Sequence, residues 1–139
     1  MILYHYTYFH RLRKRGTILA EGLKPSEHSV PPHDCLWFTT EPDPVWWWKG
    51  DHKSDIRITV AIPSTDHRLA RYEPWLRRKH PELINTVEGV AAQTGARWQE
   101  WYIYFGVVPL RRIRAVEYAD AARRSAHPAR CVGFAVARR

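Results

Sequence analysis

The sequence predicts an α+β domain in which two small sheets pack around a cleft and helices lie at the flanks. Residues 55–62 alternate apolar and polar side chains and stop at a proline, as expected of a strand in a two-sided sheet. Residues 66–79 begin with Asp66, which can cap a helix, and end before a His-Pro pair, which favours a helix there. Because no repeat or low-complexity tract is visible, residues 1–139 are expected to form a single domain.

Further elements are expected in the N-terminal part of the chain. Residues 1–7 indicate a short strand with His5 in its middle, and residues 35–40 indicate a second strand. Between them, a helix through residues 11–21 should end at Gly22, because glycine readily adopts the left-handed conformation found at helix C-termini.

The C-terminal part predicts one more helix and three more strands. A helical piece is expected over residues 81–92, with Gly95 as a break. The aromatic run 98–105 indicates a strand, and segments 113–118 and 131–136 indicate closing strands.

Glu100 is the only ionised residue between Trp98 and Gly106. Alternation along a strand predicts two faces, Trp98, Glu100, Tyr102 and Tyr104 on one and Gln99, Trp101, Ile103 and Phe105 on the other. A carboxylate in the middle of a strand is costly when buried unless it is paired. Glu100 is therefore either held against a cationic group in a functional site, or an edge-strand residue that faces water or pairs with an arginine.

Two other features have both a structural and a functional interpretation. Taken alone, His5 fits a structural histidine better than a catalytic one. Trp46, Trp47 and Trp48 are consecutive, so they must point in different directions and cannot all enter the core. Some of them are expected to line a cleft or an interface.

Together these segments resemble the ADP-ribosyltransferase superfamily, in its diphtheria-toxin-like and poly-ADP-ribose-polymerase-like branch. Residues 3–7, Leu-Tyr-His-Tyr-Thr, resemble the first motif of this family. The Ile-Leu and Gly-Leu pairs of residues 18–23 resemble the end of the helix that follows that motif. The second resembles the strand of residues 36–39, with an aromatic residue following where Trp46 to Trp48 stand. The third, which carries the catalytic Glu, is similar to residues 99–104, Gln-Glu-Trp-Tyr-Ile-Tyr.

The resemblance implies a mono-ADP-ribosyltransferase with a pair of mainly antiparallel sheets around an NAD+ cleft. Glu100 would be the catalytic carboxylate, stabilising the oxocarbenium-like transition state formed as NAD+ loses nicotinamide. The residues implied to contact NAD+ are His5, Tyr6, Thr7, Trp37, Phe38, Thr39 and Trp48. NAD+ would be a co-substrate, and no metal is required.

Two departures from the family pattern bear on this prediction. Tyr6 stands where the family usually has Gly after the motif His, so its side chain must point away from the ligand. Trp98 stands two residues before Glu100, where arginine-modifying members carry Glu or Gln. Modification of arginine is therefore disfavoured, and the acceptor is left open between nucleic acid and protein, with Trp98 and Gln99 as candidate acceptor contacts.

The net charge of +8 is unevenly distributed. Residues 111–139 hold eight arginines against two acidic residues, or +6, and two further basic clusters fall within residues 11–15 and 68–79. Such clusters beside tryptophans suit phosphate contact with base stacking, so Arg77 and Arg78 are candidate nucleic-acid contacts. Alternatively, the arginines reflect the base composition of an arginine-rich genome. Arg11, Arg13 or Arg15 could also meet the pyrophosphate of NAD+.

The remaining sequence features concern the cellular compartment and a competing metal site. Two cysteines far apart in sequence indicate reduced thiols, and no apolar run is long enough to span a membrane. We therefore expect action in a cytoplasm, that of the producing cell or of a target cell. A competing interpretation is a zinc site. Its candidate ligands would be His28, His33, Cys35 and His52, but their spacing matches no standard pattern.

Three functions stay open on the sequence alone. The leading one is an NAD+-dependent mono-ADP-ribosyltransferase, a toxin or defence factor with a cognate antitoxin or immunity protein as a partner. The others are a non-enzymatic nucleic-acid-binding module rich in Arg and Trp, and an NAD+ glycohydrolase that transfers ADP-ribose to water.

Overall fold

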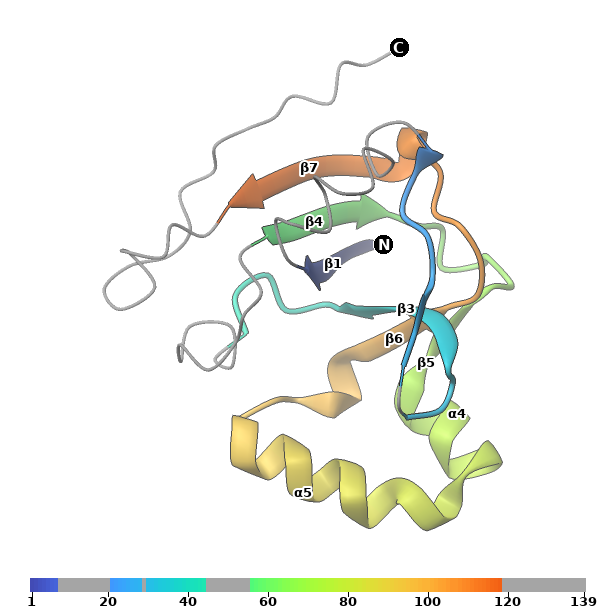
Figure 1. Ribbon diagram of the computed structural model, residues 1–139, viewed down its shortest axis with the longest axis vertical. Coiled ribbons are helices and arrows are strands. Elements are labelled where there is room, and N and C mark those ends of the chain that lie inside the picture. The colour runs from blue at the N-terminus through green and yellow to red at the C-terminus, as the bar shows by residue number, and fades with distance from the viewer. Residues whose placement is uncertain (8–20, 29, 45–55, 119–139) are drawn as a thin grey trace.

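The computed structural model describes residues 1–7, 21–28, 30–44 and 56–118, and Figure 1 shows their arrangement. The strands are β1 (Ile2–Thr7), β2 (Ser26–Glu27), β3 (Asp34–Thr39), β4 (Ile56–Ala61), β5 (Leu69–Arg71), β6 (Trp101–Tyr104) and β7 (Ile113–Tyr118). The α-helices are α4 (Tyr72–Lys79) and α5 (Ile84–Thr94), and short 3-10 turns are η1 (Pro81–Leu83), η2 (Trp98–Glu100) and η3 (Leu110–Arg112). The predicted α+β class is confirmed.

The strands form one antiparallel sheet in the order β5-β6-β3-β1-β4-β7, with β2 paired to β3. The prediction of two separate sheets is therefore corrected. The joint between β1 and β3 is nevertheless narrow, because Tyr4 and Thr39 are the one residue pair in that ladder, whereas β1 and β4 share six. The sheet thus consists of two halves, β1-β4-β7 and β3-β6-β5, that meet through a single pair (Figure 1).

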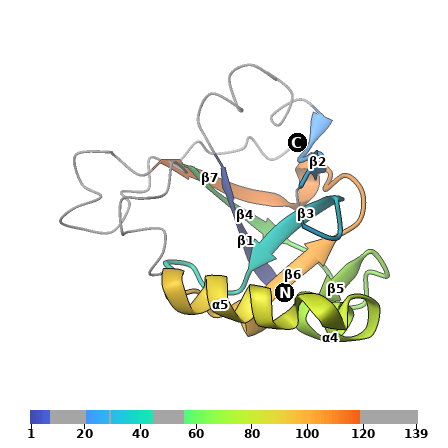
Figure 2. The same ribbon diagram turned by 60° about the horizontal axis from the view of Figure 1, so that its bottom comes forward.

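Two hydrophobic cores lie on opposite faces of β3 and β6. Alternation along β3 sends Leu36 and Phe38 to one face and Cys35 to the other. The first core joins the two halves of the sheet and includes Leu3, Leu23, Leu36, Phe38, Ile56, Ile58, Val60, Ile62, Tyr104, Val108, Ile113 and Val116. The second lies under the helices and includes Cys35, Tyr72, Leu76, Val87, Ala91, Trp98 and Ile103. Figure 2 shows α4 and α5 lying along the outer side of β3, β6 and β5.

The helix predicted over residues 66–79 begins only at Tyr72, because Leu69–Arg71 instead pair with Tyr104 to Tyr102 as β5. Asp66 caps no helix. Its carboxylate accepts hydrogen bonds from the Arg68 and Arg112 side chains and from the Tyr104 hydroxyl. These contacts with residues 104 and 112 are long-range, so the local helix signal did not reveal them.

The strand predicted over residues 98–105 is shorter in the structure, which changes the set of side chains on each of its faces. Residues Trp98–Glu100 form the 3-10 turn η2, and the strand begins at Trp101. Trp98 is only 2 % exposed and lies in the core under the helices together with Ile103, opposite the side of Tyr104. The predicted common face of Trp98, Glu100 and Tyr104 is therefore wrong, because the turn breaks the alternation.

Other predicted elements are confirmed. Strands β1, β3, β4 and β7 lie within a residue or two of their predicted bounds, and α5 ends at Gly95 with a φ of 71°. Gly22 has a φ of 89°, and a Cβ there would lie 2.3 Å from the Val108 carbonyl oxygen. The helix predicted over 11–21 lies almost wholly outside the described residues, and the strand predicted over 131–136 lies entirely outside them.

Candidate active site

Glu100 lies at the entrance to β6, beside the end of β3. The backbone N–H of Thr40 donates to the Glu100 carbonyl at 3.2 Å, which continues the β3–β6 ladder by one residue pair. The Thr40 hydroxyl donates to one carboxylate oxygen of Glu100. The Glu100 side chain is 34 % exposed, so its carboxylate is held by a neighbour yet reachable from solvent.

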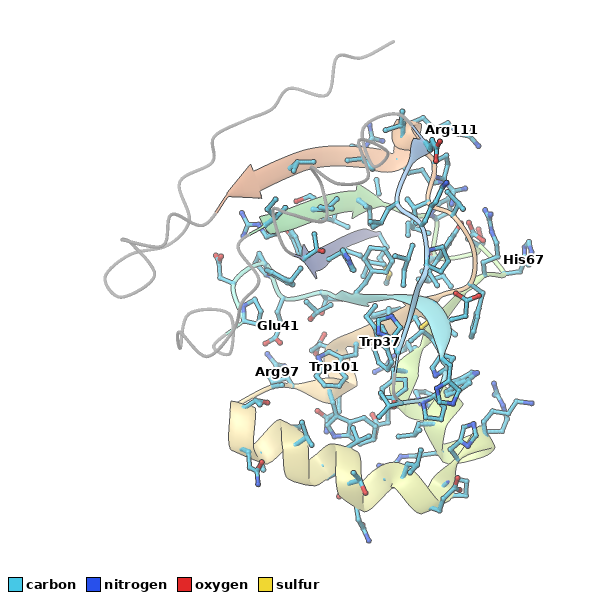
Figure 3. All side chains as sticks on the ribbon, viewed as in Figure 1. Trp37, Glu41, His67, Arg97, Trp101 and Arg111 are labelled. Carbon is cyan, nitrogen blue, oxygen red and sulfur yellow. The ribbon has the colours of Figure 1, made fainter. Side chains whose placement is uncertain are left out.

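Arg97 and Glu41 complete this group of side chains. The Arg97 guanidinium donates to Glu100 at 3.3 Å and lies 3.6 Å from the Glu41 carboxylate. Figure 3 shows Glu41 and Arg97 facing each other across the space between the end of β3 and the turn before β6. We call Thr40, Glu41, Arg97 and Glu100 the carboxylate cluster.

The carboxylate cluster has an excess of negative charge, because the Arg97 guanidinium is shared by two carboxylates, Glu41 and Glu100. Burial raises the pKa of the Glu41 carboxyl, the nearby Glu100 raises it further, and Arg97 partly offsets both effects. Glu41 is consequently a stronger base than an ordinary surface glutamate.

The segment that carries Glu41 is anchored to the other half of the sheet. The Tyr6 hydroxyl donates to the carbonyl oxygens of Glu41 and Pro42, at 3.0 and 2.7 Å. Arg57 of β4 donates to the Asp43 carboxylate at 2.9 Å and is itself paired with Glu117 of β7. The carboxylate cluster is therefore held by side chains from both halves, where the backbone ladder is narrowest.

His5 lies at the same narrow joint. Its Nδ1 is 2.8 Å from the Trp37 carbonyl oxygen, so its side chain makes a link between β1 and β3 where the ladder has few bonds. The His5 ring is 5.7 Å from the Phe38 ring. His5 thus contacts β3 at residues 37 and 38, and Glu100 contacts Thr40, the residue after that strand ends.

Tyr6, Thr7 and Thr39 have mainly structural contacts. Alternation directs Tyr6 to the opposite face of β1 from His5, as binding of a ligand beside His5 requires. Burial strongly raises the pKa of the Tyr6 hydroxyl. Thr7 is buried, and the Thr39 hydroxyl accepts a hydrogen bond from the Glu41 N–H, which fixes the turn after β3.

Trp37 and Phe38, both predicted to contact NAD+, lie on opposite faces of β3. Phe38 is 3 % exposed in the core between the sheet halves. Trp37 packs under the helices, with its ring 4.5 Å from Tyr72 and 6.0 Å from Trp101. Trp37 is therefore not on the side of His5. Trp48, the candidate for stacking on nicotinamide, lies outside the described residues.

The predicted acceptor contacts are brought together only in part. Trp98 is buried, whereas Gln99 is exposed and its carbonyl accepts from Arg71 at 3.3 Å. Arg77 pairs with Glu73 at 2.9 Å and lies over the Trp98 ring, at 5.7 Å from its centroid. Arg78 is exposed on α4. Of the four, Gln99, Arg77 and Arg78 are exposed.

Sequence analysis missed Thr40, Glu41 and Arg97. The signal available was a hydroxyl followed by a carboxylate just after a predicted strand, a position where functional side chains often project from a sheet. Nothing in the sequence linked residue 41 to residue 97, because their contact depends on the pairing of β3 with β6.

In the part of the chain that the structure describes, no three His, Cys, Asp or Glu side chains are arranged to hold a metal ion. Two of the candidate zinc ligands have ring nitrogens close to backbone carbonyls instead, His28 at 3.0 Å from Cys35 and His33 at 2.9 Å from His28. His52 lies outside the described residues.

Comparisons with known proteins reveal no relative: no family model matches the chain, and neither a curated protein nor a solved structure is detectably similar to it. No helix among the described residues is long and apolar enough to cross a membrane. The carboxylate cluster and His5 are therefore the features of this chain that bear on its function.

Proposed function

We propose that this protein is an NAD+-dependent mono-ADP-ribosyltransferase that modifies a macromolecular acceptor, a nucleic acid or a protein. The observation that carries the proposal is the partly exposed Glu100, which Thr40 holds just after β3, the strand that His5 contacts from β1. The proposal includes an ADP-ribosyltransferase-like fold, with the narrow joint as the NAD+ cleft.

The chemistry of the residues supports this reaction. Cleavage of the nicotinamide–ribose bond develops positive charge on the ribose, which a fixed carboxylate stabilises. Thr40 restrains Glu100 and leaves its second oxygen toward Arg97 and solvent. The His5 imidazole is oriented by the Trp37 carbonyl and would contact the ribose of NAD+.

A direct assay tests the proposal. The purified protein is incubated with NAD+, and nicotinamide release is measured alone and with added DNA, RNA or cell extract. We expect release that rises with the correct acceptor, together with ADP-ribose attached to that acceptor. Release without any transfer would instead make the protein an NAD+ glycohydrolase, and no release under any condition would overturn the proposal.

Exposed positive charge on α4 favours nucleic acid as the acceptor. Arg78 and Lys79 are exposed at the end of this helix, whereas Arg77 is already paired with Glu73. An exposed arginine without such a partner is better suited to a phosphate contact.

Reversing the charge of Arg78 should separate acceptor binding from NAD+ cleavage. In Arg78→Glu, modification of a nucleic-acid acceptor should fall by about tenfold or more at physiological salt, because a phosphate contact is replaced by repulsion. Nicotinamide release without acceptor should stay unchanged. The measurement is initial rate against salt concentration, with Glu82→Lys as a control that changes charge elsewhere on the same surface. Equal rates for Arg78→Glu and wild type at all salt concentrations would remove the support for nucleic acid and leave a protein acceptor.

A role as a toxin or defence factor, with a cognate antitoxin or immunity protein, belongs to the same proposal. It is supported by an activity that would damage a cell if unrestrained. The nucleic-acid-binding module without enzymatic activity is the outcome if nucleic acid binds but NAD+ is not cleaved.

A further inference from the structure

Arg97 is an exposed arginine held directly against the proposed catalytic carboxylate. Its side chain is 67 % exposed, yet its guanidinium lies 3.3 Å from Glu100 and 3.6 Å from Glu41. The Glu100 N–H donates to the Arg97 carbonyl at 2.9 Å, so the turn η2 fixes the backbone of both residues. A guanidinium is thus held directly beside the proposed catalytic carboxylate.

We propose that Arg97 is itself an ADP-ribose acceptor, modified in cis by the same polypeptide. This inference rests on the proposed function, because it requires that NAD+ bind with its reactive ribose beside Glu100. It adds a modification site in this chain and indicates that the carboxylate cluster accepts a guanidinium group.

The chemical step balances without another reactant. The bond between the ribose C1′ and the nicotinamide nitrogen breaks, and nicotinamide leaves with the electron pair of that bond. A terminal nitrogen of Arg97 forms the new bond to C1′ and gives up one proton. Glu41, which faces that guanidinium, accepts the proton and releases it to solvent. The products are nicotinamide, one proton and ADP-ribosylated Arg97.

Proximity favours Arg97 over the other described arginines. A group already held near the reacting atom avoids the entropic cost of a bimolecular encounter. Arg57 is buried and paired with Glu117 and Asp43, and Arg77 is paired with Glu73. Arg68 and Arg112 both donate to Asp66. Arg71 contacts the Gln99 carbonyl. Among the arginines that the structure describes, Arg97 is the one that contacts Glu100 and Glu41.

The experiment is mass-spectrometric mapping of the full chain after incubation with NAD+ and no acceptor. We expect one ADP-ribosyl group on the peptide containing Arg97. Its initial rate per molecule should stay constant over a hundredfold dilution of the protein, because the reaction occurs within one chain. Arg97→Lys should remove that label. Arg111→Lys is the matched control and should keep it, since Arg111 lies at the opposite end of the molecule in Figure 3.

The outcomes separate this inference from the proposed function. Nicotinamide release with the label on Arg97 supports both. Nicotinamide release with no label, or with labels only at other residues, overturns self-modification at Arg97 and leaves the transferase proposal standing. A labelling rate that falls in proportion to protein concentration overturns modification in cis. Absence of nicotinamide release overturns both proposals together.

Discussion

Replacing Glu100 with Gln should lower the rate of nicotinamide release by roughly a hundredfold or more, while the affinity for NAD+ changes by no more than a few-fold. Gln keeps the shape of Glu and can still bond to the Thr40 hydroxyl. It lacks the negative charge that stabilises the positive ribose in the transition state, and this interaction is weak in the ground state. The loss should therefore appear in kcat rather than in binding.

The measurement is steady-state release of nicotinamide together with equilibrium binding of NAD+. Glu82→Gln is a matched control, because Glu82 is an exposed glutamate on η1 that lies beside His80. Thermal unfolding of each variant establishes that the fold is intact. If folded Glu100→Gln turned over at nearly the wild-type rate, Glu100 would not be the catalytic carboxylate.

The second large effect is expected at Asp66. Its side chain is 5 % exposed and accepts hydrogen bonds from Arg68, Arg112 and Tyr104. Asp66→Asn removes the charge that these donors surround, so the free energy of unfolding should fall by about 2 kcal/mol. Urea unfolding at pH 7 measures this loss. Glu73→Gln is the control: it breaks a more exposed helix pair with Arg77 and should cost no more than about 0.5 kcal/mol.

The Asp66 effect should also depend on pH. Hydrogen bonds from Arg68 and Arg112 hold the pKa of the Asp66 carboxyl well below its ordinary value. A carboxyl whose pKa is lower in the folded state stabilises the fold above its unfolded pKa of about 4. That stabilisation is lost as the pH falls from there toward the folded pKa. The difference between wild type and Asp66→Asn should therefore shrink in acid, and a difference that stayed constant down to pH 2 would contradict the assignment.

Local patterns in the sequence predicted most of the described strands. The alternation in residues 56–61 and the glycine at position 95 report the burial and backbone geometry of their own segments, so the bounds of β4 and the end of α5 could be predicted. The same holds for β1, β3 and β7. Glu100 stood out because a charged side chain interrupts an aromatic run, and the structure puts its carboxylate at an accessible position.

The errors arose where distant residues override a local preference. Asp66 fits a helix cap by sequence, but Arg112 and Tyr104 bond to it and the chain after it pairs with β6. The strand predicted from Trp98 begins late, because burial of Trp98 against Tyr72 requires the turn η2. These partners are distant in sequence, so a pattern among neighbouring residues cannot reveal them.

The α+β class, four of the strands, the helix α5 and the prominence of Glu100 and His5 could be predicted from local sequence patterns. The arrangement of the strands in one sheet with a narrow joint, and the contacts of Thr40, Glu41 and Arg97 around Glu100, became visible only in three dimensions. The difference lies in the sequence separation of the residues involved. Hydrophobic period and glycine conformation are properties of neighbouring residues, whereas the carboxylate cluster exists because the β3–β6 ladder brings residues 40 and 100 together.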